Sequence, residues 1–247
     1  MSDLAIRWQD EAWFLLPEAA LYWPAQSMLL IADAHFGKAA SFRALGQPVP
    51  HGTTADNLRR LDAMLARHPA QRLVFLGDFL HSRQGRAPAT LDALADWRAR
   101  HAALRVTLVR GNHDRHAGDP PAALDIEVVS EPLCVSGIAL RHELLPAAGA
   151  PLHQYRKEDG KLGNERDAEQ TGIAQIAGHL HPAVRLQGPG RDHLRLPCFW
   201  FSEGRAVLPA FGAFTGTALI TPAIGDRIYA LGADRVWPAP SVAPRAP

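Results

Sequence analysis

The run Met28-Leu29-Leu30-Ile31-Ala32, followed at once by Asp33-Ala34-His35, begins the pattern on which the fold prediction rests. An apolar run of this length is typical of a strand that is covered on both faces. The polar residues after it begin a loop, and both Asp33 and His35 carry atoms that bind metal ions. The stretch therefore predicts a buried strand with a candidate ligand pair at its carboxyl end.

The same arrangement recurs along the chain, since other apolar runs of strand length are also followed by short polar motifs. The runs cover residues 72–76, 104–109, 138–140 and 173–177, and the motifs after them are Gly77-Asp78, Gly111-Asn112-His113-Asp114, Arg141-His142 and Gly178-His179-Leu180-His181. The carboxyl ends of parallel strands open onto one crevice in an α/β sheet. We therefore expect these motifs to meet in one place.

Helical patterns separate the first three of these strands. Residues 54–67 place four large apolar side chains on one stripe, and we expect Thr53 or Thr54 to cap this helix. Residues 88–100 repeat the pattern, whereas helical periodicity fades beyond Ile126 and short strands follow. The order of elements predicts a mixed α/β (α+β) fold in which a helix-covered parallel sheet packs against a second, mainly β layer.

Length and composition fit one large domain, which we place at residues 1–233 of the 247. We expect residues 143–171 to form a surface excursion, that is, a long loop on the outside of the domain. We expect the Pro-rich residues 234–247 to form a disordered tail. A formal net charge of +1 excludes a protein that coats nucleic acid by bulk positive charge. No targeting segment or membrane span is visible, and Cys134 and Cys198, both expected in or near the core, favour a reducing cytoplasmic location.

The polar motifs supply a set of nitrogen and oxygen ligands without a thiolate. The set comprises two carboxylates, four imidazoles and one amide: Asp33, Asp78, His35, His142, His179, His181 and Asn112. Such a set suits Mn, Fe, Zn, Co or Ni better than Ca or a structural zinc. Two divalent ions that share one carboxylate would use all seven ligands and leave positions open for water and substrate. Each motif alone also fits ordinary turn or capping chemistry, but their ordered recurrence at strand ends favours a site.

Asp-x-His, Gly-Asp, Gly-Asn-His-Asp, a later His and Gly-His-x-His together resemble the calcineurin-like metallophosphoesterases, over roughly residues 28–181. The resemblance implies a four-layer β-sandwich flanked by helices, with a dinuclear metal site at the carboxyl ends of strands. It also implies that Asp33, His35, Asp78 and His181 hold one ion. The second ion would be held by Asp78, Asn112, His142 and His179, with Asp78 bridging. His113 would face the substrate, and Asp114 would orient the side chain of His113.

A narrower resemblance, to the ligase-associated DNA damage response endonucleases (PdeM), rests on residues 30–50, 178–182, 195–200 and 208–216. It implies a manganese-dependent DNA phosphodiesterase that acts endonucleolytically on single-stranded regions in DNA repair, together with a ligase, a helicase and an exonuclease. Hydrolysis would proceed by two-metal activation of a bridging water. Thr217 departs from the pattern, where a second glycine is expected after Gly216.

Basic side chains beside the metal motifs are candidate contacts to substrate phosphates: Lys38, Arg43, His81, Arg83 and Arg110. Phe36 and Phe42 are candidates for stacking on a splayed base, or for packing in the core. Two other functions stay open at this point. The chain could be a phosphoesterase of nucleotides or other small molecules, because the metal ligands alone do not select the substrate, or a non-catalytic scaffold with the same fold.

Overall fold

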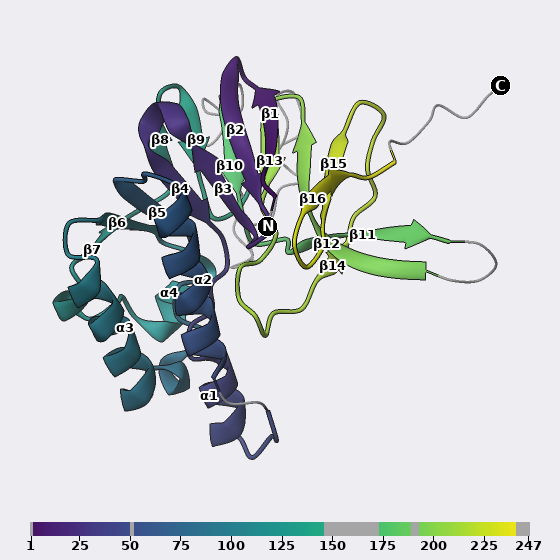
Figure 1. Cartoon of the computed structure of the whole chain (residues 1–247). Coiled ribbons are helices and arrows are strands. Elements are labelled where there is room, and N and C mark those ends of the chain that lie inside the picture. Colours follow the sequence, from purple (N-terminus) through teal and green to yellow (C-terminus); the bar gives the residue numbers. More distant parts are fainter. Residues whose placement is uncertain (1, 50–51, 146–172, 189–192, 241–247) are drawn as a thin grey trace.

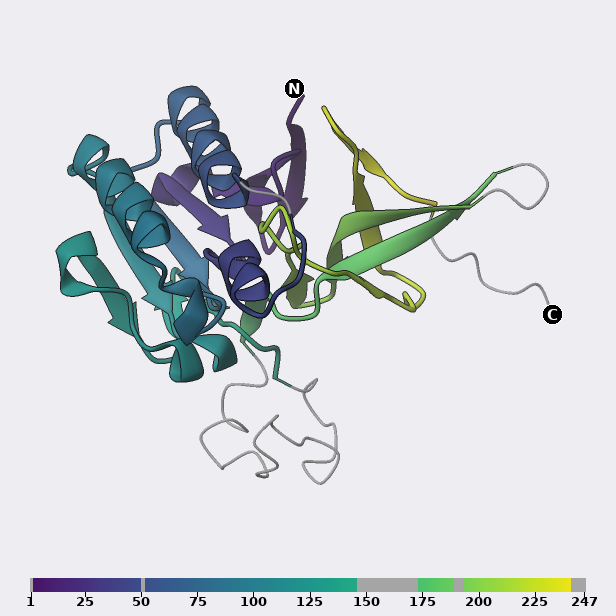
Figure 2. The ribbon, with the colours of Figure 1, turned by 90° about the horizontal axis from the view of Figure 1, so that it is seen from below.

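The computed structural model describes residues 2–49, 52–145, 173–188 and 193–240. Two β-sheets pack against each other, and helices cover the outer face of the first sheet (Figures 1 and 2). The first sheet follows the chain order from β1 to β7: β1 (Leu4–Trp8), β2 (Glu11–Leu16), β3 (Ala20–Trp23), β4 (Met28–Ile31), β5 (Arg72–Leu76), β6 (Arg105–Val109) and β7 (Ile126–Val129). Strands β1 to β4 are antiparallel, and β4 to β7 are parallel.

The second sheet has the strand order β14-β11-β12-β13-β10-β9-β8, and β15 and β16 join it through β12. Its strands are β8 (Leu133–Val135), β9 (Ile138–Leu140), β10 (Ala174–Ala177), β11 (Pro182–Gln187), β12 (His193–Ser202), β13 (Arg205–Val207), β14 (Ala218–Leu219), β15 (Arg227–Leu231) and β16 (Val236–Pro238). β9 and β10 pair in parallel, so their carboxyl ends point the same way.

The helices divide into two long ones that cover the first sheet and two short ones beside the polar loops. Their bounds are α1 (Lys38–Ala44), α2 (Thr53–Arg67), α3 (Pro88–Arg100) and α4 (Asn112–Ala117), and short 3-10 turns lie at η1 (Pro24–Gln26), η2 (Arg83–Gly85) and η3 (Ala122–Leu124). The apolar stripe of α2 is buried, with Leu61 and Met64 fully enclosed.

The parallel part of the first sheet is covered on both faces, as its apolar runs predict. Leu30 and Val74 lie in the cluster between the two sheets, whereas Leu29 and Phe75 lie in the cluster shared with α2 and α3. Neighbouring residues of one strand therefore serve different cores, since side chains alternate across a sheet. This constraint leaves the ends of these strands, and the loops after them, as the places for polar side chains.

The predicted mixed α/β fold is confirmed, and several finer expectations are corrected. α2 begins at Thr53 after Gly52, with no side-chain cap from either threonine, because Gly52 supplies the left-handed backbone (φ 90°) at that position. In the described part of the chain, the two long helices cover the first sheet, and the chain beyond Ile126 forms mainly strands, as expected.

The boundaries of the excursion and the tail also differ from the prediction. Val236–Pro238 forms β16 against β15, and Val236 joins the core, so the folded part continues past Ala233. Leu145 is buried, and its N–H donates to Gln175 at 2.9 Å, which excludes residue 145 from a surface excursion. Residues 146–171 of the excursion and 241–247 of the tail lie outside the described residues.

The two cysteines differ in exposure. Cys198 on β12 is fully buried, as expected, whereas Cys134 on β8 is exposed because β8 ends the order of the second sheet. Among the described helices, none has the length and apolar character required to cross a membrane.

The burial of the α2 stripe predicts a measurable stability difference. Leu61→Ala leaves a cavity between α2 and the first sheet and should lower the free energy of unfolding by about 2–5 kcal/mol. Leu45→Ala removes the same atoms from a residue that is 71% exposed and should change it by less than about 0.5 kcal/mol. Urea denaturation of both variants checks this, and equal losses would contradict the packing described here.

Candidate metal centre

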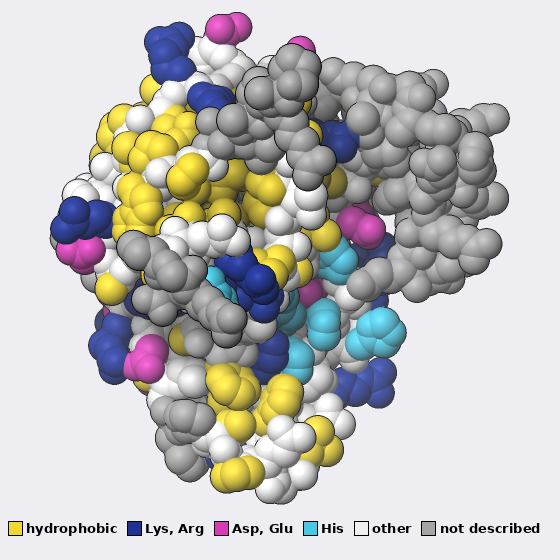
Figure 3. All heavy atoms as spheres, turned by 90° about the vertical axis from the view of Figure 1, so that its right-hand side faces the viewer, with side chains coloured by type: hydrophobic (Ala, Val, Ile, Leu, Met, Phe, Trp, Pro, Cys, Tyr) yellow, Lys and Arg dark blue, Asp and Glu magenta, His cyan; other side chains and the backbone are white. Residues whose placement is uncertain are grey.

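The polar motifs lie together, in loops after β4, β5, β6, β9 and β10, as expected from the parallel strands. Figure 3 shows the histidine side chains gathered on one face of the molecule, next to Lys and Arg side chains. Asp33, Asp78 and His142 are all nearly inaccessible to solvent. Charged and polar groups are thus concentrated in a place from which water is largely excluded, where each needs a partner.

Asp33, His35 and His181 form a first group whose ligand atoms lie close enough to hold one cation. The Oδ1 atom of Asp33 lies 3.5 Å from Nε2 of His181. Both atoms are buried, and neither has a hydrogen-bond partner among the described residues. Orphaned buried polar atoms are costly, so a carboxylate and an imidazole left in this way fit a bound metal ion.

Asp78 and His142 belong to a second group together with Asp33. Nε2 of His142 lies 3.4 Å from Oδ1 of Asp78, 2.7 Å from Oδ1 of Asn112 and 3.1 Å from Nδ1 of His179. Asp78 also approaches the first group, because its Oδ2 atom lies 3.7 Å from Nε2 of His35. The seven residues predicted as metal ligands are therefore adjacent, with Asp78 between the two groups.

The ring of His142 is fixed by the backbone of the first sheet. Its Nδ1–H donates to the carbonyl of Leu76 at 2.9 Å, and this bond leaves Nε2 free to face Asp78 and Asn112. Such a bond sets the tautomer and the direction of a metal-binding histidine. The carboxylate of Glu131 accepts the backbone N–H of His142 at 3.1 Å. The sequence gives no motif for Glu131, and only the fold brings it to this loop.

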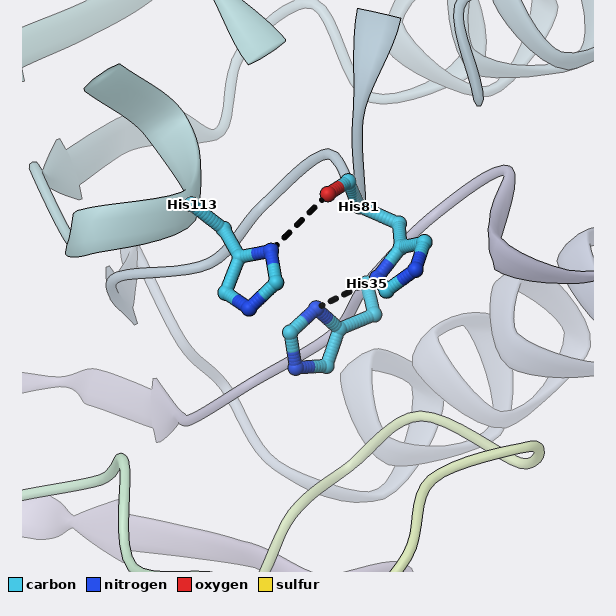
Figure 4. Close-up of side chains that lie close together, drawn as sticks. All are labelled: His35, His81 and His113. Carbon is cyan, nitrogen blue, oxygen red and sulfur yellow. Dashed lines mark hydrogen bonds between the residues drawn. The ribbon is translucent and has the colours of Figure 1, made fainter. Parts of the chain in front are cut away.

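A third group of potential ligands consists of His35, His81 and His113 (Figure 4). The rings of His81 and His113 are stacked with centroids 5.2 Å apart, and Nδ1 of His81 lies 3.5 Å from Nδ1 of His35. His81, which sequence reasoning placed among the substrate contacts, is thus part of the histidine cluster itself. Nδ1–H of His113 donates to the backbone carbonyl of His81 at 2.9 Å.

The expected role of Asp114 is corrected by these contacts. Its buried carboxylate accepts backbone N–H groups from Gly111, Asp78 and Phe79 at 2.8–3.0 Å. The described partner of the His113 ring is the carbonyl of His81, so that carbonyl, and not Asp114, orients the imidazole. Asp114 instead ties the loop after β6 to the loop after β5.

The backbone of the centre is strained. Eleven described non-glycine residues have a positive φ, and five of them are predicted ligands: Asp33, His35, Asp78, His179 and His181. Each such conformation costs on the order of 1–3 kcal/mol and tends to occur at functional sites. Gly77 has φ 79°, and a Cβ atom there would lie 2.2 Å from Nδ1 of His142. Only glycine fits between this turn and the imidazole.

Burial governs the protonation of these groups. Burial, reinforced by the charge of Lys38, lowers the pKa of His35 far below its ordinary value and that of His81 to about 4. Burial, with Asp33 and Asp114 nearby, raises the pKa of Asp78. Burial alone lowers the pKa of His142, but the carboxylates of Asp78 and Asp33 outweigh it and raise that pKa. A neutral His35 is the form that binds metal.

The basic side chains predicted to grip substrate differ in their surroundings. Lys38, at the start of α1, is partly buried, and burial lowers its pKa although Asp33 and Asp78 act in the opposite direction. Arg43 is also partly buried on α1. Arg83 donates to the carbonyl of His116 at 3.2 Å. Arg110 forms a two-point ion pair with Asp119 at 2.7 and 3.0 Å, so its guanidinium is already engaged.

The packing of Gly77 yields a test of the centre. Gly77→Ala should displace the His142 ring and lower bound metal by at least half, measured by elemental analysis after purification with Mn²⁺. Gly204→Ala is the matched control, because Gly204 also has a positive φ (69°) but nothing within 4 Å of an added Cβ. An equal loss of metal in both variants, relative to the wild type, would show that backbone strain and not the His142 contact causes the loss. Wild-type metal content in Gly77→Ala would contradict the predicted displacement of His142.

Comparisons with known proteins agree with this geometry. Residues 27–150 match the calcineurin-like phosphoesterase family. The crystal structure of the nuclease MPE from Pseudomonas putida is 44% identical, and the match covers 96% of this chain and all of that one, with a TM-score of 0.77. No curated protein sequence matches the chain.

Two further solved structures are more distant. A protein of unknown function from Aquifex aeolicus is 20% identical over 66% of this chain and 82% of its own, with a TM-score of 0.38. A phosphoesterase from E. coli, YfcE, is 17% identical over 83% of this chain and 88% of its own, with a TM-score of 0.34. The family match and the 44% identity over nearly the whole chain suffice on their own: the chain belongs to the calcineurin-like phosphoesterases, and it is a metal-dependent phosphoesterase.

Proposed function

We propose that the chain hydrolyses DNA phosphodiester bonds as a single-strand-directed endonuclease in DNA repair. The observation that carries the metal-dependent part is the pair of orphaned buried atoms, Asp33 Oδ1 and His181 Nε2, inside a complete set of nitrogen and oxygen ligands. The nuclease named in the structure that is 44% identical to this chain supports nucleic acid as the substrate class. Phosphodiester hydrolysis at a site built from these ligands is the chemistry that fits both.

The ligands divide between two ions as the resemblance implies. In this proposal Asp33, His35, Asp78 and His181 hold one, while Asp78, Asn112, His142 and His179 hold the other. Asp78 bridges them, a role supported by its approaches to His35 and His142 at 3.7 and 3.4 Å. When bound, divalent cations supply a Lewis acid that polarises the phosphoryl group and activates water near neutral pH. We propose manganese, although the donor set also suits Fe, Zn, Co and Ni.

His113 is the proposed general acid of the reaction. Its Nδ1 is taken by the His81 carbonyl, so Nε2 is the atom left to face the substrate, and the side chain is 40% exposed. The backbone N–H of His113 also donates to Oδ1 of Asp78 at 3.0 Å, which fixes the residue beside the proposed bridging ligand. From there a protonated imidazole stabilises charge on the phosphate and protonates the leaving oxygen.

The proposed substrate-binding side chains lie around the histidines. Lys38 lines a hollow beside His35 together with Thr54, Phe214 and Thr215. Phe42 lies edge-on to Phe214, with centroids 5.6 Å apart, and is partly exposed. These rings offer a surface for an unpaired base, which supports the single-strand preference, while Phe36 is buried in the core. Arg43 and Arg83 are proposed phosphate contacts, whereas the guanidinium of Arg110 is paired with Asp119 and is not proposed as one.

The remaining proposals concern the cellular location of the enzyme and the proteins with which it acts. We keep the cytoplasm as its proposed location, because neither Cys134 nor Cys198 is in a disulfide. A DNA ligase, a helicase and an exonuclease remain its proposed functional associates.

The role of His113 predicts a separation of catalysis from metal binding. His113→Ala should keep the metal content of the wild type and slow DNA cleavage by about 10²- to 10⁴-fold, the usual contribution of a general acid. Asp78→Asn should lose both metal and activity. Cleavage at the wild-type rate by His113→Ala, with Asp78→Asn inactive, would remove the assigned role.

Metal removal and substrate choice are tested together. Dialysis against a chelator should abolish nicking of closed circular single-stranded DNA, and added Mn²⁺ should restore it. A panel of nucleotides and phosphomonoesters serves as the comparison. Hydrolysis of the panel with the circle left intact would favour the small-molecule phosphoesterase, and metal content below one ion per chain without any hydrolysis would favour the scaffold.

A further inference from the structure

A two-stranded ribbon extends away from the body of the molecule (Figures 1 and 2). It consists of the outer parts of β11 and β12, and β11 begins directly after the predicted ligand His181. β14 pairs with β11 only at Pro182 and Ala183, and β15 pairs with β12 only from Cys198 onward. Among the described residues, the segments 184–187 and 193–196 therefore pair only with each other.

One face of this ribbon carries two directly opposed arginines. In the antiparallel register Arg185 faces Arg195, and Gln187 faces His193 beside them. All four residues are exposed, and β11 and β12 contain no acidic residue. Arg195 donates to the carbonyl of Thr217, whereas Arg185 has no hydrogen bond or ion pair with another described residue. Like charges directly opposite each other destabilise a strand pair, so an external anion would relieve the repulsion.

Phosphate suits this arrangement, since a guanidinium group binds phosphate oxygens through two parallel hydrogen bonds. Arg185 follows His181 by four residues, which in an extended strand corresponds to about 13 Å. This reach places Arg185 beside phosphates that flank the scissile phosphate, outside the metal centre. Within the described ranges, no other strand pairs with residues 184–187 or 193–196, so the outer edges of the ribbon are open to a partner.

We propose that Arg185 and Arg195 form a clamp for the DNA backbone that contacts phosphates flanking the scissile phosphate. This inference rests on the proposed function, and it names the part of the same substrate that lies outside the metal centre. The clamp provides a local positive site in a chain whose net charge is only +1.

The test compares substrates of different length under varied salt. For a 20-nucleotide single strand, Arg185→Gln/Arg195→Gln should lower kcat/KM about tenfold, mainly through KM. The slope of log(kcat/KM) against log[salt] should become shallower by about 1.4, since each phosphate contact on a single strand contributes about 0.7. A dinucleotide and a p-nitrophenyl phosphodiester are too short to reach the clamp and should react at the wild-type rate.

Matched variants separate the clamp from general charge and from folding. Arg7→Gln/Arg235→Gln removes the same charge from β1 and from the residue before β16, and should keep the wild-type slope. Arg185→Gln alone leaves the Arg195–Thr217 bond intact and should shift the slope by about 0.7, and Arg185→Lys should restore it. Thermal melting of each variant checks the fold.

The outcomes distinguish the clamp from the proposed function. If the wild type cleaves the 20-nucleotide strand and the arginine variants keep its KM and salt slope, the clamp is wrong and the proposed function stands. If the wild type cleaves no DNA at all, the proposed function is wrong, and the clamp is wrong with it. Leu194 on the ribbon is a large apolar side chain that is 56% exposed. An unchanged slope together with a changed oligomeric state in Leu194→Ser would assign the ribbon to a protein contact and overturn the clamp.

Discussion

Two buried carboxylates hold the loops of the metal centre in conformations that these loops would not adopt alone. Asp114 accepts three backbone N–H groups and joins the loops after β5 and β6. Asp33 accepts the backbone N–H of His179 at 2.8 Å, and this bond joins the first sheet to the second. Hydrogen bonds to a buried carboxylate are stronger than neutral ones and compensate for its desolvation. The strained ligands that follow the strands depend on these bonds.

The core explains why the centre lies where it does. The parallel strands are covered on both faces, by helices on one side and by the second sheet on the other, so they have no room for charged side chains. Polar groups can appear only where the strands end. The two sheets contribute ligands from both sides of one junction, and the fit between the sheets therefore sets the distances within the centre. A family with this fold can keep its metal chemistry while the surrounding loops and ribbons change the substrate.

Much of this was predictable because the signals are local. Apolar runs and helical periodicity identified β5 and β9 to the residue, and the recurring polar motifs identified side chains that the fold brings together. The contacts of Asp114, Glu131 and the His81 carbonyl were not predictable, since they join residues distant in sequence through backbone atoms that any residue carries. β16 was missed because prolines around it suggested disorder, although its partner β15 binds it in the sheet. The antiparallel strands β1 to β3 were not identified from the sequence.

The unequal exposure of the two thiols has a practical consequence. Burial raises the pKa of Cys198 to about 12, so this thiol stays protonated and shielded from electrophiles. Cys134 lies at the surface on β8, which pairs with β9 just before the loop of His142. The natural chain therefore accepts a fluorophore or spin label at a single position, on the strand that pairs with β9, without any engineered cysteine.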